Sequence, residues 1–97
     1  MRDPRIPQKY FCIEGFITAV QFLPDNMWSV REFCSGEVFD REQEDQYELV
    51  IVADDMQSAK IKDWVIFIHD REIFMTVTDA QFYEMNPKWI SPIDKAH

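Results

Sequence analysis

The sequence predicts an α+β domain with a small, mainly antiparallel sheet of five or six strands and two short helices. The chain has 97 residues, which is the length of one small domain. Its apolar runs are short and rich in Phe, Ile, Val and Tyr, as strands are. These runs do not alternate with helical segments in the strand–helix–strand rhythm of parallel sheets. We therefore expect a single domain over 1–97, with a flexible arm at 1–8 and a frayed tail at 91–97.

The first two strands are expected at 9–13 and 16–23, separated by the turn dipeptide Glu14-Gly15. The second strand has apolar residues on both faces. A strand that is covered on both sides belongs in the interior of a sheet. Pro24 follows this strand and ends it.

A helix is expected over 26–34, with Asp25 as its N-cap. Gly36 is expected to end this helix, because glycine is the commonest residue just past a helix C-terminus. The apolar stripe of the helix consists of Met27, Val30 and Cys34. The residues that follow, 37–46, are polar and are expected to form an acidic loop.

Three further strands complete the predicted sheet, the first at 47–53, where side chains alternate between two faces. The run at 64–68 consists of five large apolar residues, too few for a helix, and predicts a core strand. The chain turns at 69–72 and returns at 73–77, so these two strands are expected to pair as a hairpin.

The second helix has a specific start signal. Thr78 and Gln81 have the spacing of a capping box, in which each side chain bonds a free backbone N–H. The helix is expected to end at 84–85, before the stop at 86–87. Residues 89–90 are then expected to add a last edge strand.

The composition excludes several kinds of site. Two glycines in the whole chain exclude glycine-rich phosphate-binding loops. The two cysteines, Cys12 and Cys34, and the two histidines, His69 and His97, lack the spacing of a structural metal site, so neither a metal nor a cofactor is expected. Both cysteines have apolar neighbours, as in proteins of a reducing compartment. Since no signal peptide or long apolar run is present, we expect a cytoplasmic protein.

No catalytic residue is expected. His69 beside Asp70 lies at the tip of a predicted hairpin, where the sequence brings no nucleophile or second carboxylate. The serines lack the surroundings of a nucleophile elbow, and the cysteines lack a charged neighbour that would lower a thiol pKa. The sequence therefore predicts a protein that is not an enzyme.

The negative charge is concentrated in one stretch of the chain. The formal net charge is −8, and residues 37–55 alone carry −7. This is the wrong sign for direct binding to nucleic acid or to an anionic membrane. The carboxylates of this stretch form the candidate partner-binding patch, which comprises Glu37, Asp40, Glu42, Glu44, Asp45, Glu48, Asp54 and Asp55.

Two interpretations of the acidic stretch stay open. The first is a solvated loop held open by self-repulsion, as charge blocks usually are. The second is a surface that meets a basic protein or mimics nucleic acid. In extended chain the carboxylates of Glu42 and Glu44 lie about 6.6 Å apart, near twice the ~3.4 Å spacing of phosphates along one DNA strand. Such a partner also needs buried anchors, for which the candidates are Trp28, Phe39 and Tyr47.

Two stretches of the chain carry longer motifs. The first is 17–26 (Ile-Thr-Ala-Val-Gln-Phe-Leu-Pro-Asp-Asn), and the second is 59–66 (Ala-Lys-Ile-Lys-Asp-Trp-Val-Ile), which continues into 71–74 and 82–83. Together they resemble a widespread group of short phage and prophage proteins of mostly unassigned role. That group has an E-A-V-Q-aromatic opening strand and an A-x-P-G-D-(W/Y)-(I/V)-(I/V) segment, followed by G-E-F…F…Y.

The chain departs from the group in three places. Lys62 stands where the group has glycine, so the turn must either take a positive φ without glycine or change its type. Residues 1–15 extend beyond the usual start, and the acidic stretch falls where the group varies. The resemblance implies a phage or mobile-element origin and a compact α+β fold, and it supplies no catalytic residues.

Charge and resemblance together predict a small accessory protein that binds a host protein. The expected partner has a basic surface and handles nucleic acid, and the protein inhibits or redirects it, as an anti-CRISPR or a restriction blocker does. Two alternatives stay open: a virion or assembly component that self-associates through a sheet edge, and a protein that sequesters a small ligand. The protein is expected to be a monomer or a small homo-oligomer.

Overall fold

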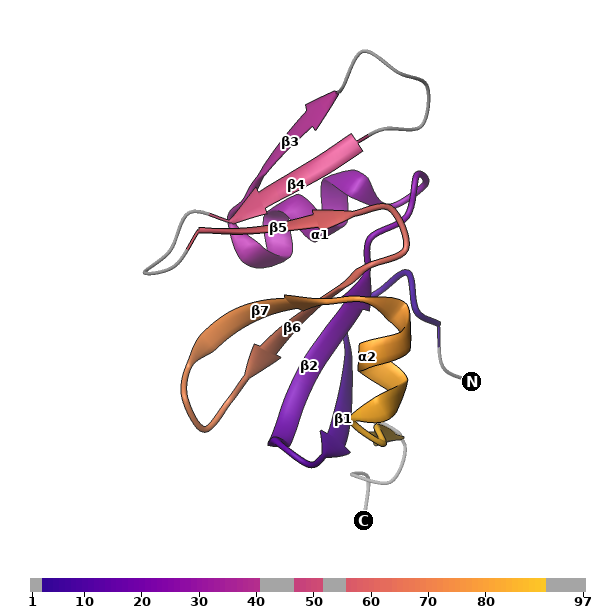
Figure 1. Cartoon of the computed structure of the whole chain (residues 1–97), viewed down its shortest axis with the longest axis vertical. Helices are drawn as coiled ribbons and strands as arrows, with labels where there is room; N and C mark the ends of the chain where they lie inside the picture. Colours follow the sequence, from indigo (N-terminus) through magenta and orange to yellow (C-terminus); the bar gives the residue numbers. More distant parts are fainter. Residues whose placement is uncertain (1–2, 41–46, 52–55, 91–97) are drawn as a thin grey trace.

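The computed structural model describes residues 3–40, 47–51 and 56–90, which form eight strands and two helices (Figure 1). Along the chain these are β1 (Gln8–Cys12), β2 (Gly15–Gln21), α1 (Met27–Cys34), β3 (Glu37–Asp40), β4 (Tyr47–Ile51), β5 (Gln57–Lys60), β6 (Trp64–Ile68), β7 (Ile73–Val77), α2 (Asp79–Glu84) and β8 (Lys88–Trp89). Every strand pair is antiparallel. The predicted α+β class is confirmed, although two sheets of five and three strands replace the expected single sheet.

The larger sheet has the strand order β7-β6-β2-β1-β8. Its β6–β7 hairpin confirms the pairing expected between 64–68 and 73–77, and β1 and β2 form a second hairpin. Gly15 closes the first hairpin with a φ of 88°, which glycine adopts without steric strain. The expected last edge strand is present one residue earlier, at Lys88–Trp89, where it pairs with β1.

One face of the larger sheet is covered by α2 (Figure 1), and an aromatic core lies between them. Phe82 of α2 stacks on Trp64 of β6, with 3.8 Å between the ring centroids and 9° between the planes. Phe82 also meets Tyr10 edge to face at 5.3 Å. The indole N–H of Trp64 donates to Asp79 Oδ1 over 2.7 Å, which ties the start of α2 to the sheet.

The start of α2 confirms the predicted capping box. Thr78 Oγ1 accepts a hydrogen bond from the backbone N–H of Gln81 (3.1 Å), and Gln81 Oε1 accepts one from the N–H of Thr78 (2.9 Å). Beyond the helix, Asn86 takes a left-handed conformation with a φ of 57°. Both ends of this six-residue helix are therefore fixed by local hydrogen bonds and turn geometry.

The two ends of α1 differ from prediction. Asn26 is the N-cap residue, and the carboxylate of Asp25 instead bonds the guanidinium of Arg5 at 3.1 Å. At the other end the left-handed conformation falls on Ser35, with a φ of 54°, and not on the glycine that follows. Gly36 is required for space: a Cβ there would lie 2.9 Å from a backbone oxygen of β4.

The smaller sheet, of order β3-β4-β5, contains two strands that the sequence did not predict. Residues 37–40 of the expected acidic loop form β3 instead. Residues 57–60 (Gln-Ser-Ala-Lys) form β5, although they lack the branched and aromatic residues typical of strands. The other residues of the expected loop, 41–46, lie outside the described residues.

A second core lies between α1, the smaller sheet and the far side of the larger sheet. Its buried members are Val20, Phe22, Val30, Cys34, Leu49, Ile51, Ala59 and Val65. Two of the three residues predicted as the apolar stripe of α1 are therefore buried, and Met27, the third, packs at the border of this core. Phe33 of α1 meets Phe74 of β7 edge to face at 5.4 Å, which extends the contact between the layers.

The side chain of Gln57 connects the two sheets. Its Nε2 donates to the carbonyl of Phe74 (3.0 Å), and its Oε1 accepts from the N–H of Thr76 (2.9 Å). Thr76 Oγ1 in turn donates to the carbonyl of Ser58 (3.0 Å). The amide group of Gln57 thus bonds the exposed edge of β7 as a neighbouring strand would.

Residues 3–8, expected to belong to a flexible arm, make specific contacts. The N–H of Gln21 donates to the carbonyl of Pro4 (2.8 Å), and Asn26 Nδ2 donates to the carbonyl of Arg5 (2.8 Å). Gln8 is already part of β1. This segment therefore lies against the turn that leads into α1.

Candidate functional site

The turn before α1 is held by a buried amide. Asn26 is buried, and its Oδ1 accepts from the N–H of Leu23 at 2.8 Å. Its Nδ2 donates to the carbonyls of Arg5 and Gln21, both at 2.8 Å. These three bonds fix the direction in which α1 leaves the turn, and with it the position of the exposed side of the helix.

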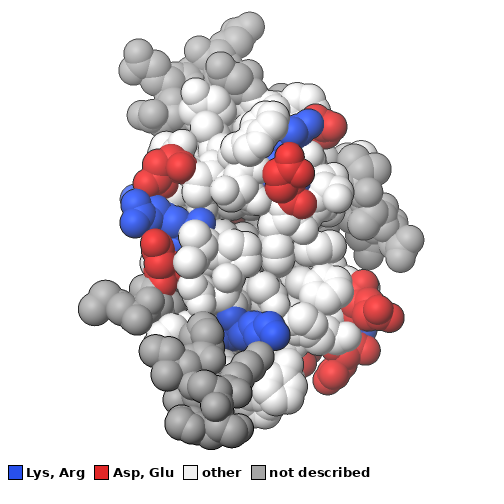
Figure 2. Space-filling model, turned by 180° about the vertical axis from the view of Figure 1, so that it is seen from behind, with Lys and Arg blue, Asp and Glu red and all other residues white. Residues whose placement is uncertain are grey.

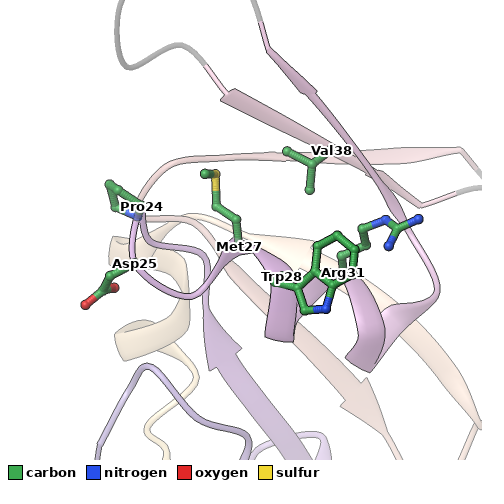
Figure 3. A pocket seen from close by; sticks show the side chains of 6 residues that line it. All are labelled: Pro24, Asp25, Met27, Trp28, Arg31 and Val38. Atoms are coloured by element: carbon green, nitrogen blue, oxygen red, sulfur yellow. The ribbon is translucent and has the colours of Figure 1, made fainter.

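Beside this turn lies a groove of about 430 Å³ between α1 and β3 (Figure 3). Its lining is mostly apolar and consists of Pro24, Asp25, Met27, Trp28, Arg31 and Val38. The turn supplies Pro24 and Asp25, α1 supplies three residues, and β3 supplies Val38. We call this feature the Trp28 groove.

Trp28 is the most exposed aromatic residue among those described, with 70% of its surface accessible. The guanidinium of Arg31, one helical turn further on, lies 4.8 Å from the centre of its ring. Such a cation–π contact holds the indole against the helix, so the ring is positioned although it is open to solvent. A tryptophan with fixed orientation beside an apolar groove is typical of an interface anchor.

The charged groups near the groove differ in the ion pairs that they form. Hydrogen bonds with Asp3 and then with Asp25 raise the pKa of Arg5, and the Arg5 guanidinium in turn lowers the pKa of Asp3. Arg5 and Asp25 are therefore occupied with each other. Arg31 forms no ion pair with any residue that the structure describes.

The three predicted anchors lie in different places. Trp28 is in the groove, and Phe39 is also exposed, at 46%. However, Val38 faces α1, so Phe39 points to the opposite side of the smaller sheet by strand alternation. Tyr47 packs against the second core and is only partly accessible. The structure therefore does not bring these three aromatic residues together on one surface.

Most of the predicted acidic patch lies outside the described part of the chain. This holds for Glu42, Glu44, Asp45, Asp54 and Asp55. Asp40 ends β3, and Glu37 at the start of the same strand is exposed. Glu48 of β4 is partly buried and is the Cα partner of Phe39 on one side and of Lys60 on the other. The described strands thus place Glu37 and Glu48 on the outer side of the smaller sheet.

A second exposed aromatic surface was missed in the sequence. Phe16 was assigned to a strand covered on both sides, yet it is 55% exposed, and its Cα partner Phe11 is 48% exposed. Both lie on the face of the larger sheet away from α2, because Tyr10 and Ile17 next to them fill the core under that helix. The second core covers only one end of this face, near Val20. The available signal was their symmetric placement about the hairpin turn, which makes Phe11 and Phe16 partners.

The histidine that the sequence analysis considered as a base, His69, lies on the surface. His69 Nε2 lies 2.8 Å from Thr18 Oγ1 on the surface, and its ring packs on Phe67 at 5.0 Å. In residues 3–40, 47–51 and 56–90 no three His, Cys, Asp or Glu side chains are placed to share a metal ion. Both helices within these ranges are too short to cross a bilayer.

Comparison of the chain with models of known families, with characterised proteins and with solved structures found no match. The resemblance to short phage proteins therefore stays a prediction.

Proposed function

We propose that this protein is a non-enzymatic binding protein of phage or prophage origin that inhibits or redirects a host protein with a basic, nucleic-acid-handling surface. In this proposal the Trp28 groove receives an apolar side chain of the partner. The negative charge of the chain attracts the partner over a distance. The proposal is carried by one observation, the 70% exposed Trp28 held beside an apolar groove of about 430 Å³.

The net charge and the Trp28 groove contribute to binding in different ways. Electrostatic attraction between a chain of net charge −8 and a basic partner mainly raises the association rate. Binding energy at protein interfaces comes mainly from a few buried anchors, with Trp and Arg the most frequent. The Trp28 groove offers one of each, since Arg31 is stacked on the indole and free of ion pairs with described residues. Affinity should therefore depend on the groove, and association rate on salt.

The test compares captures from a bacterial lysate by the wild-type chain and by Trp28→Ala. We expect the wild-type chain to retain a nucleic-acid-binding protein that Trp28→Ala loses. With the retained protein purified, Trp28→Ala should weaken binding by at least about 30-fold, the equivalent of the ~2 kcal/mol typical of an interface hot spot. Raising the salt concentration should slow association of the wild-type chain.

Met56→Ala is the matched control, because Met56 is 74% exposed but does not line the groove. This variant should bind as the wild-type chain does. Retention of the same proteins by the wild-type chain and by Trp28→Ala would contradict the proposal. A partner whose association rate does not change with salt would contradict the electrostatic part alone.

A further inference from the structure

The face of the larger sheet away from α2 has an aromatic centre. Phe11 and Phe16 are directly paired across β1 and β2, and their rings meet at 5.0 Å with 63° between planes. Lys88 of β8 is the Cα partner of Phe11 on one side. On the other side the N–H of His69 donates to the carbonyl of Phe16 at 3.2 Å. A row of four side chains therefore runs from β8 across β1 and β2 to the residue that follows β6, and we call this surface the open sheet face.

Positive charge lies on the β8 side of the open sheet face. Lys88 shares the face with Phe11 because directly paired residues of antiparallel strands point the same way. Lys9 shares it because it is two residues from Phe11 on β1. Both lysines are exposed, and neither forms an ion pair with another described residue.

Negative charge lies at the end of the strands where the β1–β2 and β6–β7 turns meet, with the β6–β7 turn on the side of the sheet away from β8. Glu14 of the first turn and Arg71 of the second are 3.6 Å apart. The carboxylate of Asp70 lies over Gly15, since a Cβ built there would be 3.0 Å from Asp70 Oδ2. Glu72 is exposed in the same turn. Figure 2 shows the result in the lower half of the molecule, where uncharged surface separates a blue area from a red one.

We propose that the open sheet face binds a second copy of this chain across a two-fold axis parallel to the strands. Such an axis brings the same patch of both copies together. It reverses the order of the strands, so β8 of each copy lies over the β6–β7 side of the other. Phe11 and Phe16 then meet their counterparts at the centre, and Lys88, which is level with His69 in the sheet, comes beside the β6–β7 turn of the other copy twice.

A second copy fits this face better than nucleic acid does. A nucleic-acid groove needs a track of several cations, whereas among the described residues the face offers only Lys9 and Lys88, on a chain of net charge −8. A second copy supplies aromatic rings opposite the aromatic centre and carboxylates beside Lys88. The surface is also separate from the Trp28 groove, so self-association leaves the proposed partner site in place.

The first experiment measures the molar mass in solution by sedimentation equilibrium. We expect the wild-type chain to form dimers with a Kd of about 100 μM or tighter. Phe11→Ser with Phe16→Ser should be monomeric and should keep the wild-type circular dichroism and tryptophan fluorescence, because both rings are half exposed. Phe39→Ser is the control: this exposed phenylalanine lies on the smaller sheet, so the variant should still form dimers.

The second experiment exchanges the charges. Lys9→Glu with Lys88→Glu makes the face negative on both sides, and Asp70→Lys with Glu72→Lys makes it positive on both sides. Each variant alone should be monomeric, whereas a mixture of the two should form a heterodimer because every charged contact is again between opposite signs. Heterodimers in the mixture that are absent from each separate sample support the two-fold arrangement.

A wild-type chain that stays monomeric at about 200 μM, well above the expected Kd, would overturn the proposal. A mixture that stays monomeric while the wild-type chain forms dimers would overturn the two-fold arrangement. A labelled oligothymidylate is the third probe, used at about 50 mM salt, where phosphate contacts are strong. Its binding by the wild-type chain, lost with Phe11→Ser and Phe16→Ser, would assign the face to single-stranded nucleic acid and overturn the proposal.

Discussion

At Lys62 the backbone lies in the left-handed region, with a φ of 83°. This conformation costs an L-residue about 1–2 kcal/mol, because Cβ approaches the following carbonyl oxygen. The turn is held by its neighbours: the N–H of Lys62 donates to the carbonyl of Phe22 (2.7 Å), and Gln21 Nε2 donates to the carbonyl of Lys62 (2.9 Å). The turn is therefore held by hydrogen bonds to the N–H and the carbonyl of Lys62, and the lysine is strained within it.

Lys62→Gly should stabilise the protein. Glycine removes the strain at the positive φ but makes the unfolded chain more flexible, so the free energy of unfolding should rise by about 0.5–1 kcal/mol. Urea unfolding followed by tryptophan fluorescence measures this change. Lys62→Ala is the control, since alanine removes the charge but keeps Cβ. An equal gain from alanine would show that charge, and not backbone strain, is the cause.

A second residue-scale prediction concerns the Cys34 thiol. Burial raises the pKa of this thiol, whose Sγ donates to the carbonyl of Val30 at 3.2 Å. The folded protein therefore keeps the proton at pH values at which the unfolded chain has lost it. Above the ordinary thiol pKa of about 8.5, the free energy of unfolding should fall as the pH rises, by at most ~1.4 kcal/mol per pH unit.

Unfolding measured at several pH values between about 7 and 10, on either side of that thiol pKa, tests this. The comparison is with Cys34→Ala, which removes the titrating group and leaves Cys12 and the tyrosines in place. The decline with pH should be smaller in Cys34→Ala than in the wild-type chain. Parallel pH profiles of the two proteins would contradict the prediction.

At the scale of elements, Gln57 joins the two sheets through the edge of β7. Gln57→Ala leaves the N–H of Thr76 and the carbonyl of Phe74 without these partners. Partly buried groups that lose their partners cost about 1–3 kcal/mol, so the free energy of unfolding should drop by that amount. Ser58→Ala is the control, because Thr76 Oγ1 bonds the main chain of Ser58 and not its side chain. Thermal unfolding of both variants should separate them clearly, and equal stabilities would refute the bridging role of Gln57.

Some of the helices and strands could be predicted from the sequence, and others could not. The capping box at Thr78 and the hairpin that returns through 73–77 are local patterns, and both are present. β5 was missed because its residues carry little strand preference, whereas the contacts that position it, such as the packing of Ala59 into the second core, come from distant parts of the chain. Phe16 was misassigned because its exposure depends on how far the second layer reaches over β2. A local sequence pattern does not indicate how far the second layer extends over β2.

At the scale of the whole molecule, the candidate site could be predicted only in part. Trp28 was a candidate anchor from residue type alone, and the structure places it exposed beside a groove. Phe39 and Tyr47 were chosen on the same grounds, but Phe39 lies on the other side of the smaller sheet and Tyr47 packs against the second core. Residue type indicates which side chains make good anchors, whereas the folding of two sheets against α1 decides which of them share a face.

The net charge has a consequence for the whole molecule. The chain measures 49 × 29 × 24 Å, and the screening length is about 30 Å at 0.01 M salt but only about 8 Å at 0.15 M. At low salt the charges of all parts of the molecule therefore act on one another. With a net charge of −8, this interaction is mainly repulsive and destabilises the compact state.

The melting temperature should therefore rise between about 0.01 M and 0.15 M NaCl, as the screening length falls below the width of the molecule. The matched variant carries Glu42→Gln, Glu44→Gln and Asp45→Asn, which lowers the net charge to −5 and preserves side-chain size. Its melting temperature should rise less, because repulsion grows with the square of the charge. A melting temperature that falls with added salt would mean that the acidic residues are held by favourable ion pairs. In that case they would not be free to attract a basic partner, and the electrostatic part of the proposed function would fail.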